Sequence, residues 1–350
     1  MTNAAESADR ARASWDALLD ACGRAEDHEL AITEPPFIQT TRAAVWPLSQ
    51  VLAAAMDLAG LDHHGPGVPH DFDAEVDRLL AGLEHHRRGD AYSAYPSEHL
   101  RYYDDNAWVG LGLVQWHAQR NRDRDLVAAR RVFEFAARGE HGDGGVHWRE
   151  GRRQPRNTCS TAPAMQLALR LQAVTNEPGL VEFALRADAF LCDTLESADG
   201  LLWDHVDADG AVDPAIWSYN QGSTVSARVL LGAATGDRRH IRRATALVDA
   251  TLAYFGTGDR WWDQPAAFNA ICFRNFAAAV SIAPELGADR IRKATLDYLD
   301  RVWEEARDED TGLFVNSGIG RYDQGCIDQA GLTQLFALSA WAPERLHVVA

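Results

Sequence analysis

The sequence lacks the features of a membrane-bound or nucleic-acid-binding protein. It contains no apolar run of the roughly 20 residues that a membrane-spanning helix needs. The N-terminus has no basic start followed by an apolar core, so it does not resemble a secretory signal, and we expect a cytoplasmic protein. Basic residues are few, with 34 Lys and Arg against 51 Asp and Glu and a net charge of −17. Because nucleic acids and anionic membranes require a basic surface, we expect neither as a partner, and a neutral or cationic substrate fits better.

Cysteine is scarce as well, and no metal-binding pattern is visible. The cysteines are odd in number and have no paired spacing: Cys22, Cys159, Cys192, Cys272 and Cys326. They are typical of reduced core residues. The histidine pairs His63–His64 and His85–His86 have neither the i, i+4 spacing of a helical metal site nor an acid cluster beside them, which favours solvated surface histidines. We therefore expect no metal and no other cofactor.

Helices dominate the pattern of apolar residues, and little strand is expected. Periodicity and helix-breaking residues predict twelve helices, over residues 4–22, 40–60, 71–88, 104–120, 123–138, 158–176, 178–195, 218–235, 237–255, 266–282, 287–306 and 326–341. Odd-numbered ones are amphipathic and charged, whereas even-numbered ones are rich in Ala, Gly, Ser and Leu and almost free of charge. A helix that is apolar all round is buried, and one with a charged face borders water. The alternation therefore predicts six outer and six inner helices.

The loops that follow the charged helices repeat too. Successive copies are about 50–60 residues apart, the length of a helical hairpin plus a loop: GDGGVHW (142–148), ADGLLWD (198–204), GDRWWD (258–263) and DTGLFVN (310–316). Six hairpins of one outer and one inner helix predict an all-α fold, a closed (α/α)6 barrel, in a single catalytic domain over residues 1–350. An open solenoid would need distinct capping repeats, and neither terminal hairpin differs from the others.

Two adjacent acids, Asp104 and Asp105, stand in YYDDNAW at the start of a predicted inner helix. One interpretation is structural, because Asp is favoured at helix N-caps and in the first turn. The other is chemical, since a retaining glycosidase needs two carboxyl groups about 5–5.5 Å apart and adjacent residues can reach that separation. The charge of one acid would raise the pKa of the other and keep it protonated. A second acid beside a cap adds repulsion, yet spacing alone leaves both interpretations open.

Several motifs follow one another along the chain: YYDDNAW (102–108), GDGGVHW, DGLLWD, SYNQG (218–222) and FNAICFRN (268–275). Through these motifs the sequence resembles glycoside hydrolase family 76, the endo-α-1,6-mannanases. The resemblance implies an (α/α)6 barrel that hydrolyses α-1,6-mannosidic bonds, in mannan or manno-oligosaccharides, with retention and without a metal. It also implies that Asp104 is the nucleophile and Asp105 the acid/base. The expected partner is then a neutral α-mannoside.

Other candidate sugar-binding residues lie near the starts of inner helices or beside the repeated loops. Tyr219, Asn220 and Gln221 open the helix at 218–235, where amides and a phenol suit sugar hydroxyls, although capping would also explain them. Arg274 is a charge on an otherwise apolar helix and needs a carboxylate partner, either a structural or a catalytic one. The role of Asn275 is left open in the same way. The aromatic candidates are Tyr103, Trp108, Trp148, Trp217 and Trp262.

Two other functions remain compatible with such a barrel. A sugar isomerase of the N-acylglucosamine 2-epimerase type relies on inner-helix histidines as proton carriers, and the predicted inner helices offer little beyond His117. A non-catalytic carbohydrate-binding barrel is opposed only by the retained acid pair.

Overall fold

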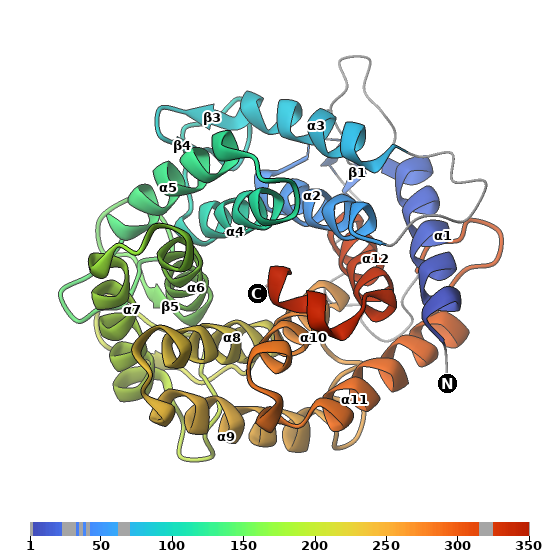
Figure 1. Ribbon diagram of the computed structural model, residues 1–350. Helices are drawn as coiled ribbons and strands as arrows, with labels where there is room; N and C mark the ends of the chain where they lie inside the picture. Colours follow the sequence, from blue (N-terminus) through green and yellow to red (C-terminus); the bar gives the residue numbers. More distant parts are fainter. Residues whose placement is uncertain are drawn as a thin grey trace.

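The computed structural model describes residues 3–22, 33–34, 38–39, 43–61, 71–314 and 325–349. Its helices lie in two concentric rings (Figure 1). The inner ring consists of α2 (Val45–Ala59), α4 (Tyr103–Arg120), α6 (Thr158–Thr175), α8 (Ser218–Thr235), α10 (Ala266–Ile282) and α12 (Cys326–Ala340). The outer ring consists of α1 (Ala4–Cys22), α3 (Phe72–Leu83), α5 (Asp123–Ala137), α7 (Pro178–Phe190), α9 (Arg238–Phe255) and α11 (Ala288–Arg301).

The inner ring is closed where its first and last helices meet. Each inner helix packs against the next one along the chain, and α12 packs against α2. Outer helix α1 packs against α12, so helices from the two ends of the chain lie side by side (Figure 1). The predicted (α/α)6 toroid is confirmed by this arrangement.

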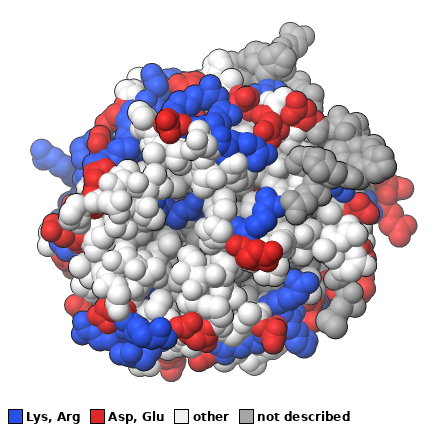
Figure 2. Space-filling view, viewed as in Figure 1, with Lys and Arg blue, Asp and Glu red and all other residues white. Residues whose placement is uncertain are grey.

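Burial follows the predicted alternation of the helices. Every residue of α6 from Thr158 to Leu171 is buried, whereas α9 buries a stripe that includes Ala244, Leu247 and Thr251. Figure 2 shows the same division on one face, where charged side chains lie mostly toward the rim and uncharged residues cover most of the middle. Small residues let the inner helices approach closely. At Gly222 of α8 a Cβ would overlap the backbone of Cys272 in α10.

Short strands and altered helix ends are the parts of the fold that the sequence pattern does not show. The predicted helix 71–88 ends at Leu83 and is followed by a 3₁₀ turn. The last turns of the predicted helices 178–195 and 287–306 are π-helices, Leu191–Leu195 and Val302–Ala306. Strands pair as β1 (Thr33–Glu34) with β2 (Ile38–Gln39), β3 (Arg87–Arg88) with β4 (Ala91–Tyr92), and β5 (Arg156–Asn157) with β6 (His205–Val206) and β7 (Val212–Asp213). Two-residue strands are too short to leave an alternating pattern.

The histidine and cysteine predictions have different outcomes. His63 and His64 lie outside the described residues, and His85 is exposed. His86 is buried, with Nδ1 3.1 Å from the Ser93 carbonyl oxygen, so the prediction of a surface histidine is wrong there. The cysteines are free, and all are buried except Cys192, which is half-buried.

A 3₁₀ helix, η5 (Pro343–Val349), occupies the centre of the ring at one end (Figure 1). It follows the end of α12, and Arg170 Nη2 of α6 donates a hydrogen bond of 2.8 Å to the Val348 carbonyl oxygen. The segment therefore covers the end of the ring at which the inner helices finish. Among the described helices, none combines the length and apolar content that a membrane span requires.

Candidate active site

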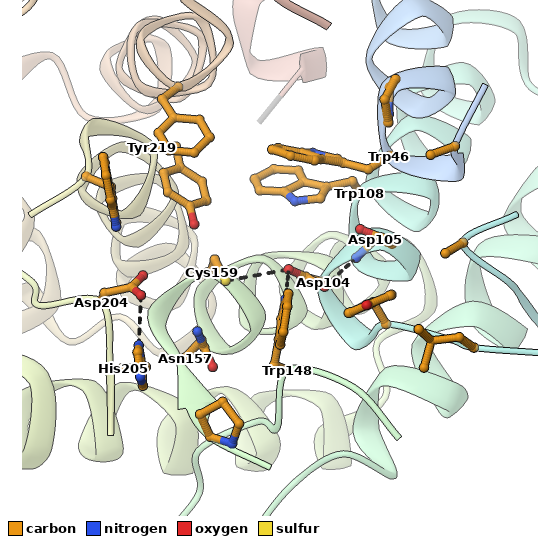
Figure 3. A pocket seen from close by; sticks show the side chains of 18 of the residues that line it. Trp46, Asp104, Asp105, Trp108, Trp148, Asn157, Cys159, Asp204, His205 and Tyr219 are labelled. Carbon is orange, nitrogen blue, oxygen red and sulfur yellow. Dashed lines mark hydrogen bonds and ion pairs between the residues drawn. The ribbon is translucent and has the colours of Figure 1, made fainter. Parts of the chain in front are cut away.

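A cleft of about 740 Å³ opens at the other end of the ring, where the inner helices begin. Residues at or next to the starts of α2, α4, α6, α8 and α10 line it, including Trp46, Asp104, Cys159, Tyr219 and Phe268. Asp104 and Asp105 lie together on one side of this cleft (Figure 3). Five inner helices therefore contribute residues at or near their starts to one cleft.

The start of α4 is held in place by contacts on both sides. Tyr102 is extended, with φ −101° and ψ 141°, and occupies the N-cap position. The Tyr103 N–H donates to the Trp148 carbonyl oxygen at 2.9 Å, and the Tyr103 ring packs against Phe135 with centroids 4.9 Å apart. Asp104 and the residue after it then fall in the first helical turn, whose N–H groups favour negative charge. Since Tyr102 is the N-cap, neither acid is the capping residue.

The Asp104 carboxylate accepts three hydrogen bonds. The Asp105 N–H donates to Oδ1 at 2.9 Å, the Trp148 indole Nε1–H donates to Oδ2 at 3.1 Å, and the Cys159 thiol donates to Oδ2 at 3.5 Å (Figure 3). Asp105 differs, because no described residue donates a hydrogen bond to its carboxylate. Donors favour the ionised form of an acid, so the two aspartates have unequal environments.

This difference separates the pKa values of the two acids. Burial raises the pKa of Asp104 to about 7, and its three donors oppose that rise. Burial and the charge of Asp104 raise the pKa of Asp105 well above the ordinary aspartate value, with no donor to oppose them. The three donors favour the charge on Asp104, so when the pair holds a single proton, that proton is on Asp105. One ionised and one protonated carboxyl group can act as nucleophile and acid at the same time.

The opposite wall carries groups that the sequence analysis did not single out. Asp204 and His205 line the cleft, with His205 Nδ1 2.8 Å from Asp204 Oδ2 (Figure 3). Their ligand atoms and those of Asp213 lie within 4.8 Å of one another, and no other group in the described part of the chain brings three such atoms together. These residues could hold a metal ion, so the absence of a metal stays a prediction. Asp204 ends the repeated loop ADGLLWD, and this position was the one feature of the sequence that could have identified it as a cleft residue.

Aromatic rings form much of the remaining lining. Tyr219 stacks on Phe268 with centroids 4.1 Å apart, and Trp217 meets the same ring edge-on at 5.6 Å. Trp46 and Trp108 also line the cleft. Sugar rings present apolar C–H faces that pack well on such surfaces. Trp46 and Phe268 were not among the sequence candidates.

The comparisons with known proteins agree with this geometry. The family model described as glycosyl hydrolase family 76 matches residues 29–341. The chain belongs to glycosyl hydrolase family 76. It is therefore a glycoside hydrolase. A search of the curated proteins found no match.

Solved structures similar to this family 76 chain share its fold at low identity. One is a family 76 mannosidase from Bacteroides thetaiotaomicron VPI-5482, with 22% identity, a TM-score of 0.79 and coverage of 95% of this chain and 98% of that one. A second is an inactive variant of an α-1,6-mannanase from Salegentibacter sp. HEL1_6 in complex with α-1,6-mannotriose, with 19% identity, a TM-score of 0.78 and coverage of 95% and 99%. A third is Dfg5 from Chaetomium thermophilum in complex with glucosamine, with 16% identity, a TM-score of 0.76 and coverage of 99% and 90%.

Several sugar-binding candidates of this family 76 chain lie away from the cleft. The Tyr103 ring packs on the outer side of α4 against Phe135, and Trp262 is buried with the Arg301 guanidinium 4.2 Å from its ring centroid. The Gln221 side chain is hydrogen-bonded to the backbone of Leu202, since its Oε1 accepts from the Leu202 N–H and its Nε2 donates to the Leu202 carbonyl oxygen. Asn220 reaches the cleft only indirectly, since its Nδ2 lies 3.4 Å from Asp204 Oδ1.

Arg274 and Asn275 lie deeper, inside the ring. Arg274 forms an ion pair with Asp57 and donates to Gln115. Of the two partners that the sequence left open, the structure therefore supplies the structural carboxylate. Asn275 Oδ1 accepts from Gln166 Nε2 at 2.9 Å. Arg274 and Asn275 line a cavity of about 30 Å³ below the cleft, which has room for about one water molecule.

Proposed function

We propose that this family 76 enzyme is a retaining α-mannosidase that cleaves α-1,6-mannosidic bonds. The observation that carries the proposal is the unequal hydrogen bonding of two adjacent acids, three donors on Asp104 and none from a described residue on Asp105. A retaining glycosidase needs an ionised nucleophile beside a protonated acid. The described α-helices all belong to the two rings, which supports a single catalytic domain.

In the first step, Asp104 attacks the anomeric carbon of the mannosyl unit. The glycosidic C–O bond breaks as the new C–O bond to Asp104 forms, and Asp105 gives its proton to the departing oxygen. The products are a covalent mannosyl-enzyme and the shortened sugar with a free hydroxyl group. Asp105 is left ionised at the moment when Asp104 has lost its charge.

In the second step, the roles of Asp105 reverse. The ionised carboxylate takes a proton from a water molecule, whose oxygen attacks the anomeric carbon and displaces Asp104. Two inversions at the same carbon give a product of retained configuration. Asp104 is again ionised and Asp105 again protonated, so the cycle is closed.

The substrate class is supported by the cleft lining and by the solved neighbours. Among the described residues that line the cleft there is no Lys or Arg, while Trp46, Trp108, Trp217 and Tyr219 provide aromatic surface. This lining favours a neutral oligosaccharide. One neighbour is an inactive variant of an α-1,6-mannanase, in which two consecutive aspartates are replaced by asparagine, in complex with α-1,6-mannotriose. An isomerase is disfavoured, because His117 lies near the end of α4 that is far from the cleft.

The test is proton NMR of the earliest products from α-1,6-mannotriose. Retention requires that α-mannose units appear before mutarotation produces the β-anomer. Initial β-anomer would mean inversion, with carboxyl groups roughly 6.5–9.5 Å apart, and would remove the adjacent pair as the catalytic residues. No cleavage of any α-mannoside would reject the proposed substrate class.

A further inference from the structure

The Asp104 carboxylate contacts a thiol that the mechanism above does not use. We propose that Cys159, held by Tyr219, is a positioning residue that commits one oxygen of Asp104, Oδ1, to nucleophilic attack. The proposal rests on the proposed function in taking Asp104 as the nucleophile. It adds which oxygen reacts and what holds the carboxylate in that orientation.

The chain of contacts begins at Tyr219 in the first turn of α8. Tyr219 is 9% exposed, and its ring stacks on Phe268, which fixes the direction of the hydroxyl group. The Tyr219 hydroxyl donates a hydrogen bond to Cys159 Sγ, and the Cys159 thiol donates to Asp104 Oδ2 at 3.5 Å. Cys159 is 5% exposed and lies in the first turn of α6. Residues of α6 and α8 thus hold one oxygen of a carboxylate on α4, Cys159 directly and Tyr219 through Cys159.

The thiol acts as a donor because it remains protonated. Burial, followed by the nearby charges of Asp104 and Asp204, raises the pKa of Cys159 well above the ordinary thiol value. A neutral thiol beside a carboxylate gives a weak S–H···O hydrogen bond and adds no second charge. The contact therefore orients Asp104 without competing with it as a nucleophile.

Counting lone pairs identifies the reactive oxygen. An ionised carboxylate offers about four acceptor positions, two on each oxygen. On Oδ2 both are used, by the Trp148 indole and the Cys159 thiol. Of the other described residues, one donates to Oδ1, through the Asp105 N–H, and this leaves a lone pair of Oδ1 for the anomeric carbon. Removing the thiol frees a position on Oδ2, so either oxygen can then face the substrate.

The titratable groups around Asp104 come from four segments of the chain. They are Asp105 and Tyr102 at the start of α4, Cys159 of α6, Tyr219 of α8, and Asp204 in the loop before β6. Burial raises the pKa values of Tyr102, Cys159 and Tyr219, so these three groups stay protonated and neutral in the neutral range. A change in Cys159 should therefore be read through the ionisation of the aspartate pair, as an apparent value that belongs to both acids.

The experiment compares Cys159→Ala, Cys159→Ser and Tyr219→Phe by the pH dependence of kcat/KM on an activated aryl α-mannoside. Loss of one donor should move the acid limb up by about half to one pH unit in Cys159→Ala, since a hydrogen bond contributes about that much to an ionisation. Below the limb, kcat/KM should fall about three- to tenfold relative to the wild type. Cys159→Ser keeps a donor and should lie between the wild type and Cys159→Ala. Tyr219→Phe should shift the limb in the same direction by less.

The matched control is Cys272→Ser, because Cys272 is a buried cysteine of inner helix α10 that does not line the cleft. It should leave the limb where it is in the wild type. An unmoved limb in Cys159→Ala would overturn the proposal, and so would equal shifts in Cys159→Ala and the control. If Cys159→Ala does not fold, an unmoved limb in both Cys159→Ser and Tyr219→Phe has the same force. The proposed function fails in a different way, through inverted product or no cleavage of α-mannosides.

Discussion

The hydrogen bond from Trp148 to Asp104 gives the most direct test of how the cleft separates its two acids. Trp148→Phe keeps an aromatic ring and removes only the Nε1–H donor, which lies 3.1 Å from Asp104 Oδ2. A hydrogen bond to a charged group contributes roughly 1.5–3 kcal/mol. Trp148 is 38% exposed, so solvent screening reduces this to about 1–1.5 kcal/mol. At about 1.4 kcal/mol for each pKa unit, the pKa of Asp104 should rise by about one unit from its value of about 7.

The sign of the effect on activity follows from the proposed role of Asp104 as nucleophile. The nucleophile must be ionised, so kcat/KM falls as the pH drops through its pKa, and a raised pKa moves that limb upward. At pH 6 the variant should lose about tenfold in kcat/KM, and the loss should shrink above pH 8. The control is Trp46→Phe, which alters the same cleft at an indole whose Nε1 has no hydrogen-bond partner among the residues that the structure describes. A limb that stays in place in Trp148→Phe, or moves equally in Trp46→Phe, would refute the reasoning.

Three further predictions address the remaining parts of the site. Asp105→Asn should form the mannosyl-enzyme from an activated aryl mannoside but not from a substrate with a sugar leaving group. Azide should restore turnover of this variant and give α-mannosyl azide as the product. Equal loss of activity on both substrates would contradict the acid/base role. Arg274→Met should lower the free energy of unfolding by about 3–5 kcal/mol in urea titrations, because it leaves the fully buried Asp57 carboxylate without its ion pair. Adding Asp57→Asn should recover much of this lost stability, and no recovery would contradict the pairing. Activity should survive EDTA, and full loss with recovery on adding a divalent cation would instead assign a metal to Asp204 and His205.

The sequence predicted the two rings of helices because the burial of a helix is visible in its amino-acid composition. Charge-free helices such as α6 and striped helices such as α9 can be recognised from composition alone, since burial of a charge is costly. Asp104 and Asp105 could be found because they stand directly at a predicted helix start. Family resemblance then favoured catalysis over capping, which spacing alone could not do.

The misses have specific physical causes. Trp46 was overlooked because the helix was expected to begin at residue 40, whereas α2 begins at Val45 and brings Trp46 to the cleft. Tyr103 was proposed from its neighbours, but side chains of adjacent helical residues point about 100° apart, and this ring faces α5. The partner of Arg274 is separated from it by 217 positions in the sequence, so no local pattern could identify Asp57.

The segment at the centre of the ring closes the toroid at one end and leaves it open at the other. Residues Pro343–Val349 cover one end, and the cavity of about 30 Å³ between that segment and Trp108 has no room for a sugar ring. An oligosaccharide can therefore only lie across the mouth or dip into it, and it cannot be threaded through. Both halves of a cleaved chain must leave by the opening through which the substrate arrived. In the proposed mechanism, the departing half has to clear that opening before water can reach the mannosyl-enzyme, so the shared opening sets the order of departure and hydrolysis.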